Sequence, residues 1–473
     1  MSAPSVDRAP RARATGRPAR RPAAVGPRSA AGPERPGRLE ALRQRLVAPA
    51  DPVVLGVFRV GFGLVMAASV IRFLVLGWAG PLYVEPAFHF SYPGFGWVRP
   101  LPLWALHAVL GGAAVAALAF AWGRAARAWL AVFVAAFTYV ELIDAATYLN
   151  HYYFVSAVGV LMLFLPMGAA LVPGRPARAS VPAWTVGALR VQVGLVYVFA
   201  GVAKLNADWL VEAMPLRIWL PARGGLPVVG PLLDLDWVPW AFAWGGALFD
   251  LAAPFLLSVR RLRPWAYAAA VAFHVATYAL FNIGVFPFVM VAAALVFFEG
   301  DEWRALGLGG RRAGRGGAVR PPRLAAGAVA VLLLVQLALP LRHWLYPGNR
   351  LWTEEGFRFA WHVMVAEKTG TAEFLVTDPA SGRTWTVAPG DDLTALQEKQ
   401  MAFQPDLLWQ YARHVERQFQ AAGYADVEVR AETYVSVNGR PGAPLVNPAV
   451  DLTAAPRGLG PKPWILRTPP PIP

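Results

Sequence analysis

The sequence predicts a mainly α-helical protein, a polytopic membrane bundle of about nine spans followed by a small α+β domain. Of its 473 residues, 56% are hydrophobic and only 15% are charged, and the mean hydropathy is +0.42. These values are typical of a chain that crosses a membrane several times. Composition divides the chain into a basic tail over 1–48, an apolar region over 49–345 and a domain of ordinary soluble composition over 346–473.

The basic tail is rich in Arg, Pro and Ala. Residues 1–45 hold eleven arginines against three acidic residues, which gives a net charge of +8. This composition predicts disorder. An Arg-rich segment before a hydrophobic span is more often a cytoplasmic anchor than a nucleic-acid-binding arm, so we expect no nucleic-acid partner. No signal-peptide core follows the arginines, so we expect the tail to stay attached.

Nine apolar stretches follow, and several are long enough to cross a hydrocarbon layer of about 30 Å as helices, which satisfy their own backbone polar groups. The seventh and eighth stretches are short and nearly continuous, so one bent or re-entrant unit is the alternative. The expected spans are 53–76, 101–122, 127–147, 152–172, 183–204, 238–259, 264–281, 283–299 and 324–341.

The loops predict the orientation. The loops after the second, fourth, sixth and eighth spans are rich in arginine, whereas the others carry few positive charges. The positive-inside rule then places the N-terminus in the cytoplasm and the C-terminal domain on the outer face. Five polar residues are consequently expected at the same depth, the outer membrane boundary: Asn150, His151, Lys204, His274 and His343.

The region 346–473 predicts a small exoplasmic α+β domain. "AEFLVTDPASGRTWTVAP" alternates in hydropathy and turns at 378–382, as a hairpin does. "DLTALQEKQ" and "PDLLWQYARHVERQFQAAG" have helical spacing, and "DVEVRAETYVSVNG" returns to a period of two.

Lys204 is the first candidate for chemistry. The chain has 44 basic residues, of which only four are lysines. A lysine at a helix end can be a membrane anchor whose stem snorkels to the headgroups. An arginine would serve equally as an anchor, whereas only a lysine can lose its proton and act as a general base. The arginine bias therefore favours a chemical role.

Other polar residues in the bundle have structural alternatives. His151, His274 and His343 could be interfacial or helix-packing groups. We expect no metal site, because no two histidines have the spacing of a helix-borne ligand pair and the chain lacks cysteine. Arg59 and Arg72 are expected to face the bundle and pair with a carboxylate. No Walker loop, GxSxG elbow or HExxH motif is present.

Several motifs resemble the vitamin K-dependent γ-glutamyl carboxylases and their bacterial relatives with the same transmembrane domain. The most specific is "VYVFAGVAKLNADWL" at 196–210, an apolar run that ends in a lysine, an acidic residue and Trp. The similarity covers about residues 51–455. The other motifs are "DPVVLGVFRVGFGLVM", "YLNHYYF", "FHVATYALFNIGVFPFVM", "LWTEEGFRFAWHVMV" and "ETYVSVNGRPGAPLVNPAVDL".

This resemblance implies roles for the candidate residues. Lys204 matches the family's base, which deprotonates the reduced vitamin K hydroquinone, and His151 with Asn150 matches groups beside the reacting quinone. His274 and His343 fall where the family also has histidines and are expected to bind the cofactor. The implied reaction is γ-carboxylation of a peptidyl glutamate with carbon dioxide, coupled to quinone epoxidation by dioxygen, with a quinol of the menaquinol or phylloquinol type.

The resemblance also implies a setting, a bacterial cytoplasmic membrane with a peptide or protein glutamate as substrate. The animal enzymes have a much larger lumenal region than 346–473, so the motifs support quinone oxygenation more directly than carboxylation. Two alternatives stay open. One is a quinone-binding oxidoreductase, epoxidase or transporter without carboxylation, and the other is a non-catalytic membrane scaffold whose outer domain holds a partner.

Overall fold

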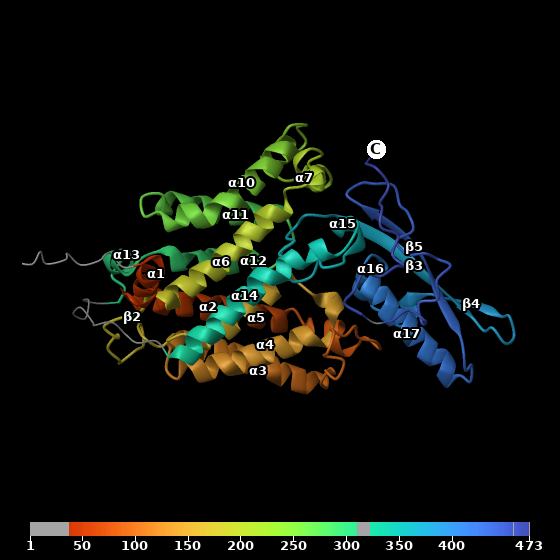
Figure 1. Cartoon of the computed structure of the whole chain (residues 1–473), viewed down its shortest axis with the longest axis horizontal. Coiled ribbons are helices and arrows are strands. Elements are labelled where there is room, and N and C mark those ends of the chain that lie inside the picture. The colour runs from red at the N-terminus through yellow and green to blue at the C-terminus, as the bar shows by residue number, and fades with distance from the viewer. Residues whose placement is uncertain (1–36, 310–321, 457, 473) are drawn as a thin grey trace, which may run out of the picture. The chain divides into compact units, whose positions relative to one another are not determined.

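The computed structural model describes residues 37–309, 322–456 and 458–472, and it is mainly helical (Figure 1). Within these residues, six helices are long and apolar enough to cross a membrane, so the chain is an integral membrane protein. They are α2 (Val53–Val75), α3 (Leu103–Trp122), α4 (Ala126–Ile143), α6 (Ala183–Ala203), α10 (Val238–Ser258) and α14 (Arg323–Leu341).

The predicted count of nine spans is not confirmed. The other three predicted spans correspond to α5 (Asn150–Met162), α11 (Arg263–Leu280) and α12 (Phe286–Ala294). Helices α5 and α12 are too short to cross alone, and α11 is less apolar than the six. Helices α11 and α12 are separate, because the connection between them contains Gly284 at a φ of +61°.

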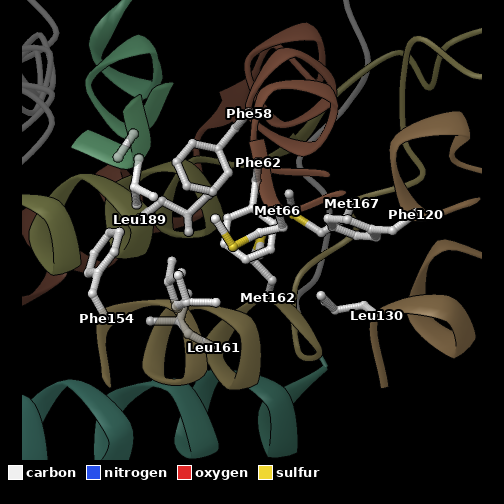
Figure 2. Packing of buried hydrophobic residues seen from close by; sticks show 14 of the residues in the cluster. Phe58, Phe62, Met66, Phe120, Leu130, Phe154, Leu161, Met162, Met167 and Leu189 are labelled. Carbon is white, nitrogen blue, oxygen red and sulfur yellow. The ribbon is translucent and has the colours of Figure 1, made fainter. Parts of the chain in front are cut away.

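A buried apolar cluster holds the bundle together (Figure 2). Phe62 of α2 meets Phe120 of α3 and Phe133 of α4 edge to face, with ring centroids 6.2 and 6.0 Å apart. Gly63 permits this packing, because a Cβ there would lie 2.6 Å from the carbonyl oxygen of Ala117 on α3. The cluster also contains side chains from α5 and α6, so the short α5 is packed inside the bundle.

Arg59 on α2 explains how the chain after α5 can leave the helical conformation. Its guanidinium is fully buried and donates to four backbone carbonyls at the end of α3 and beyond α5. The prediction that Arg59 pairs with a carboxylate was therefore wrong. The Arg72 guanidinium lies over the Trp78 ring, with its central carbon 4.8 Å from the ring centroid. The four acceptors are Ala121 at 3.2 Å, Met167 at 2.8 Å, Ala170 at 2.8 Å and Leu171 at 2.6 Å.

The C-terminal region contains the predicted combination of strands and helices. Strands β3 (Lys368–Thr377), β4 (Thr384–Val387) and β5 (Glu428–Val437) form an antiparallel sheet in the order β4-β3-β5. The expected hairpin turn lies between β3 and β4. Helices α16 (Ala395–Ala402) and α17 (Pro405–Ala421) group with the sheet in Figure 1 and bury its apolar face.

The N-terminal tail differs in part from the prediction. Arg38–Val47 form helix α1, whereas disorder was expected up to residue 48. Leu, Ala, Arg, Gln and Glu dominate this stretch, and all favour helix. The expectation for residues 1–36 lies outside the described residues.

Several short strands and α-helices lie between or beside these elements. They are β1 (Pro49–Ala50), β2 (Val181–Pro182), α7 (Ala207–Leu210), α8 (Leu216–Trp219), α9 (Gly230–Leu233), α13 (Gly300–Ala305) and α15 (Arg350–Thr353). The first two pair antiparallel. Helices α7, α8 and α9 lie in the connection between α6 and α10, directly after Lys204.

Candidate functional site

A small apolar cavity of about 70 Å³ lies where α6, α10, α11 and α12 meet the C-terminal domain. We call it the lysine cavity. Most of its wall is aliphatic or aromatic, and its ionisable side chains are Lys204, Asp250, His274 and Tyr197. Val363 and Met364 of the C-terminal domain also line it.

Lys204 is the residue at the C-terminal end of α6, and its side chain turns into this cavity rather than toward lipid or solvent. The residue is only 5% exposed. Its Nζ donates to Asp250 Oδ2 at 2.8 Å and to the Ala200 carbonyl at 3.2 Å, with a longer contact of 3.5 Å to the Val363 carbonyl. Nζ also lies 5.2 Å from the Trp209 ring centroid. This geometry differs from that of a headgroup anchor, which was the structural alternative for Lys204.

Asp250 on α10 was missed by the sequence analysis. It is 5% exposed, and within the described residues its partner is the Lys204 amine. Helices α6 and α10 approach closely beside this pair, and Gly201 permits this because a Cβ there would lie only 2.7 Å from the Leu251 side chain. A lone carboxylate within an apolar span is costly unless it has a partner or a function, and that was the available signal.

His274 and Tyr197 form the second polar pair of the lysine cavity. His274 Nε2 lies 2.9 Å from the Tyr197 hydroxyl, and both side chains are buried. The other ring nitrogen, His274 Nδ1, is buried and has no hydrogen-bond partner within the described ranges. A buried nitrogen without a partner is costly, so Nδ1 is available to a polar group of a ligand.

His151 and Asn150 start α5 on the other side of Phe286. The His151 ring centroid lies 5.8 Å from the Phe286 ring, and that of His274 lies 6.1 Å from the same ring. His151 is buried but does not line the lysine cavity. Asn150 Nδ2 donates to the His362 carbonyl at 3.2 Å, and the next carbonyl along the chain contacts the lysine.

His343 does not join the other candidates. Its Nδ1 lies 2.7 Å from the Pro340 carbonyl, and its ring is 5.3 Å from the ring of His362. It does not line the lysine cavity. His362 was also missed by the sequence analysis. Burial, together with the nearby Arg350, lowers the pKa of His362 to about 3, so this ring is neutral and serves packing.

The segment after Lys204 is held by the C-terminal domain. Asp208 accepts hydrogen bonds from both terminal nitrogens of Arg440, at 2.7 Å each, and from Asn438 Nδ2 at 2.8 Å. Burial raises the pKa of the Asp208 carboxyl, but these donors outweigh it and leave the pKa below its usual value. A second link joins Gln397 Nε2 of α16 to Asp144 Oδ2 at 2.6 Å, beyond the end of α4.

The donor set suits an aromatic ligand with hydroxyl or carbonyl groups better than a metal. The ring-lined wall can stack against such a ligand, while the amine and the free imidazole nitrogen can bind its oxygens. Over the described ranges, no three His, Asp or Glu side chains are arranged to hold a metal ion.

Fold and site together define a polytopic membrane protein whose helical bundle and C-terminal domain share an apolar cavity around a buried amine. Comparison with known families identifies both parts. The HTTM domain matches residues 47–303, and the vitamin K-dependent gamma-carboxylase lumenal domain matches residues 322–470. The chain therefore belongs to the vitamin K-dependent gamma-carboxylase family. No solved structure matches it. Helix α14, expected in the bundle region 49–345, falls within the lumenal-domain match.

Proposed function

We propose that this protein catalyses vitamin K hydroquinone-dependent γ-carboxylation of a peptidyl glutamate, coupled to epoxidation of the quinone by dioxygen. The carrying observation is the Lys204 amine, buried in an apolar cavity with Asp250 as its counter-ion among the described residues. Family membership supports a carboxylase-like activity. The proposed setting is a cytoplasmic membrane, with the tail inside and the C-terminal domain outside.

Lys204 is the proposed base for the hydroquinone hydroxyl. It must be neutral to accept a proton, and Asp250 Oδ2 is 2.8 Å from Nζ, within reach of proton transfer. The ion pair and the neutral amine–acid pair have the same net charge, so the transfer needs no ion from solvent.

The hydroquinone, when bound, supplies with dioxygen the basicity that no side chain has at neutral pH and that removal of a γ proton requires. The remaining tasks fall to the protein. His274 Nδ1 is free to bind a ligand oxygen, and Tyr197 fixes the orientation of that imidazole through Nε2. Phe273 and Phe286 offer faces for a flat ring.

The C-terminal domain is proposed to exclude water from this chemistry. Val363 and Met364 form part of the cavity wall, and the Asn150 bond to the His362 carbonyl fixes the segment that carries them. In this arrangement Asn150 positions this part of the cavity wall. His151 contacts Phe286, which separates it from the lysine cavity. His343, which lies away from the lysine cavity, is the least supported of the proposed cofactor-binding residues.

The test uses the full chain in lipid nanodiscs with chemically reduced menaquinone-4, dioxygen, labelled bicarbonate and a glutamate-containing peptide. Epoxide is measured by chromatography and carboxylation by label in the peptide. We expect Lys204→Ala to lower epoxide formation at least about 100-fold, as loss of a general base does. Lys399→Ala, the same change at an exposed lysine, should leave it unchanged.

The outcomes separate the alternatives. Wild-type epoxide formation in Lys204→Ala rejects the lysine as base. Epoxide without labelled peptide, over a range of glutamate peptides, supports an epoxidase without carboxylation. Consumption of quinol without epoxide supports an oxidoreductase, and an inert wild-type protein supports a scaffold.

A further inference from the structure

A second and larger cavity, of about 670 Å³, lies on the other side of the bundle. Helices α4, α5, α6 and α14 form its membrane part, and α17 and loops of the C-terminal domain form the rest together with the loop before α3. We call it the α14 cavity. It shares no lining residue with the lysine cavity, so the proposed carboxylase chemistry assigns it no role.

Two glutamine side chains in its membrane part have unused hydrogen-bonding atoms. Gln192 of α6 is 0% exposed, and neither its Nε2 nor its Oε1 has a partner in the described part of the chain. Gln336 of α14 donates from Nε2 to the Tyr153 hydroxyl at 2.8 Å, whereas its Oε1 is unpaired. All three side chains line the α14 cavity.

A buried amide without a hydrogen-bond partner destabilises a membrane protein. Transfer of an amide into an apolar environment without a hydrogen bond is strongly unfavourable, and nearly all buried polar groups in proteins have a partner. Leucine at position 192 would avoid this cost in a helix that is otherwise almost entirely apolar. The amide therefore points to a ligand that supplies both an acceptor and a donor.

The charges on the wall exclude an anionic ligand such as an acidic peptide. Within the described ranges, every charged side chain of the α14 cavity already has a partner, and carboxylates outnumber cations by four to three. The pairs are Glu141 with Ser156, Glu354 with Lys368, Glu355 with Arg467 and Lys462, Arg358 with Asp406, and Arg342 with the Arg358 carbonyl. A neutral head group fits this wall.

The position of α14 indicates that the ligand comes from the membrane. One face of α14 lines the cavity through Leu332, Gln336 and Leu339, and the opposite face is exposed, with Val331 at 60% and Leu334 at 63%. This helix is thus the partition between the cavity and the lipid. The mostly aliphatic and aromatic wall suits an apolar tail.

We propose that the α14 cavity binds a neutral membrane amphiphile whose head both donates and accepts hydrogen bonds, held by Gln192 and Gln336. Two sources share this chemistry, an isoprenoid quinol and a neutral lipid such as a diacylglycerol. The binding does not depend on Lys204 or on turnover, so it stands or falls separately from the proposed carboxylase function.

The experiment uses the full chain in phosphatidylcholine nanodiscs with two photoreactive probes, reduced menaquinone and dioleoylglycerol, each with a diazirine in its tail. Crosslinked peptides are mapped by mass spectrometry. We expect saturable labelling of 323–341 by at least one probe, and the identity of that probe distinguishes the sources. Labelling of 263–280 by the quinol reports the lysine cavity instead.

Gln192→Leu is the decisive variant. Loss of hydrogen bonds in a buried site should raise the probe concentration for half-maximal labelling of 323–341 about ten-fold. The Tm should stay the same or rise, because no bond within the protein is lost. Val191→Leu, on the exposed face of α6, and Lys204→Ala should both label as the wild type does.

Three results would overturn the proposal. They are no saturable labelling of 323–341 by either probe, unchanged labelling in both Gln192→Leu and Gln336→Leu, and a clear fall in the Tm of Gln192→Leu. The last would show that the amide serves the fold. Gln336→Leu provides the second measurement if the first variant cannot be purified.

Discussion

Asp208→Ala tests whether the segment that follows Lys204 is held in place by the C-terminal domain. The wild-type carboxylate accepts three hydrogen bonds, two from Arg440 at 2.7 Å and one from Asn438 at 2.8 Å. The paired side chains of Asp208 and Arg440 are only 11% and 9% exposed. The variant leaves a nearly buried guanidinium without its counter-ion, and breaking such a pair costs about 3–5 kcal/mol.

Thermal unfolding in detergent, followed by tryptophan fluorescence, measures the effect. A cost of this size should lower the Tm by roughly 3–8 °C. Glu212→Ala is the matched control, because its ion pair with Arg217 spans 3.8 Å with both side chains about 40% exposed, and exposed pairs contribute at most about 1 kcal/mol. The double variant Asp208→Ala with Arg440→Met should recover part of the loss, since it removes the uncompensated charge as well.

The pH dependence of the Tm difference provides a second test of the same ion pair. Because the folded-state pKa of Asp208 lies below its usual value, its stabilisation is present above the unfolded pKa of about 3.9. It is lost as the pH falls through the lower folded-state value. The Tm difference between wild type and Asp208→Ala should therefore be constant from pH 8 to 5 and shrink below pH 4. An equal Tm for the two proteins at pH 7 would refute the reasoning.

Three further predictions concern stability and turnover. Gly123→Ala should lower the Tm by several degrees, because φ is +91° and the new Cβ would lie 2.5 Å from the buried guanidinium carbon of Arg59. Gly111→Ala is the control and should leave the Tm unchanged, because nothing lies within 4 Å of its new Cβ. His362 should contribute a loss of about 2 kcal/mol of stability between pH 7.5 and 5.0, since its pKa is about 3 when folded and 6.5 otherwise. This stabilisation is present above pH 6.5 and lost toward pH 3, so the difference in unfolding free energy between wild type and His362→Phe, from urea titrations, should change by that amount over this pH range. Asp250→Asn should lower the Tm and reduce epoxide formation at least about ten-fold, because it leaves the Lys204 ammonium with carbonyl partners alone. Wild-type values for both the Tm and epoxide formation would contradict a role for the Lys204–Asp250 pair.

Hydropathy predicted the long helices well and the short ones poorly. The expected spans 53–76, 183–204 and 238–259 differ from α2, α6 and α10 by a single residue at one end. The span expected at 152–172 ends at Met162. Apolar composition continues to Val172, but the chain there is not helical, because one buried arginine binds three of its carbonyls. Hydropathy counts apolar side chains and carries no information on backbone partners.

The candidate site was predictable in proportion to how unusual each residue is in its setting. Lys204 stood out because the chain otherwise uses arginine, and Asp250 could have been found as a lone carboxylate in an apolar span. His274 lines the cavity, whereas His343 at a similar expected depth does not. Depth along the membrane normal does not give position around the bundle. The Val363 carbonyl had no sequence signal, because every residue has one.

The lysine cavity needs both matched regions of the chain. The bundle supplies the amine, its counter-ion and the imidazole, all within residues 47–303. The residues that cover the amine, Val363 and Met364, belong to the match over 322–470. Because Asp208 bonds to Arg440 and Asn150 bonds to the His362 carbonyl, the position of this cover depends on contacts that flank the lysine on both sides. A domain that docks on the segment next to Lys204 can therefore control water access to its amine. For this reason we expect Asp208→Ala to impair turnover at temperatures where the variant is still folded.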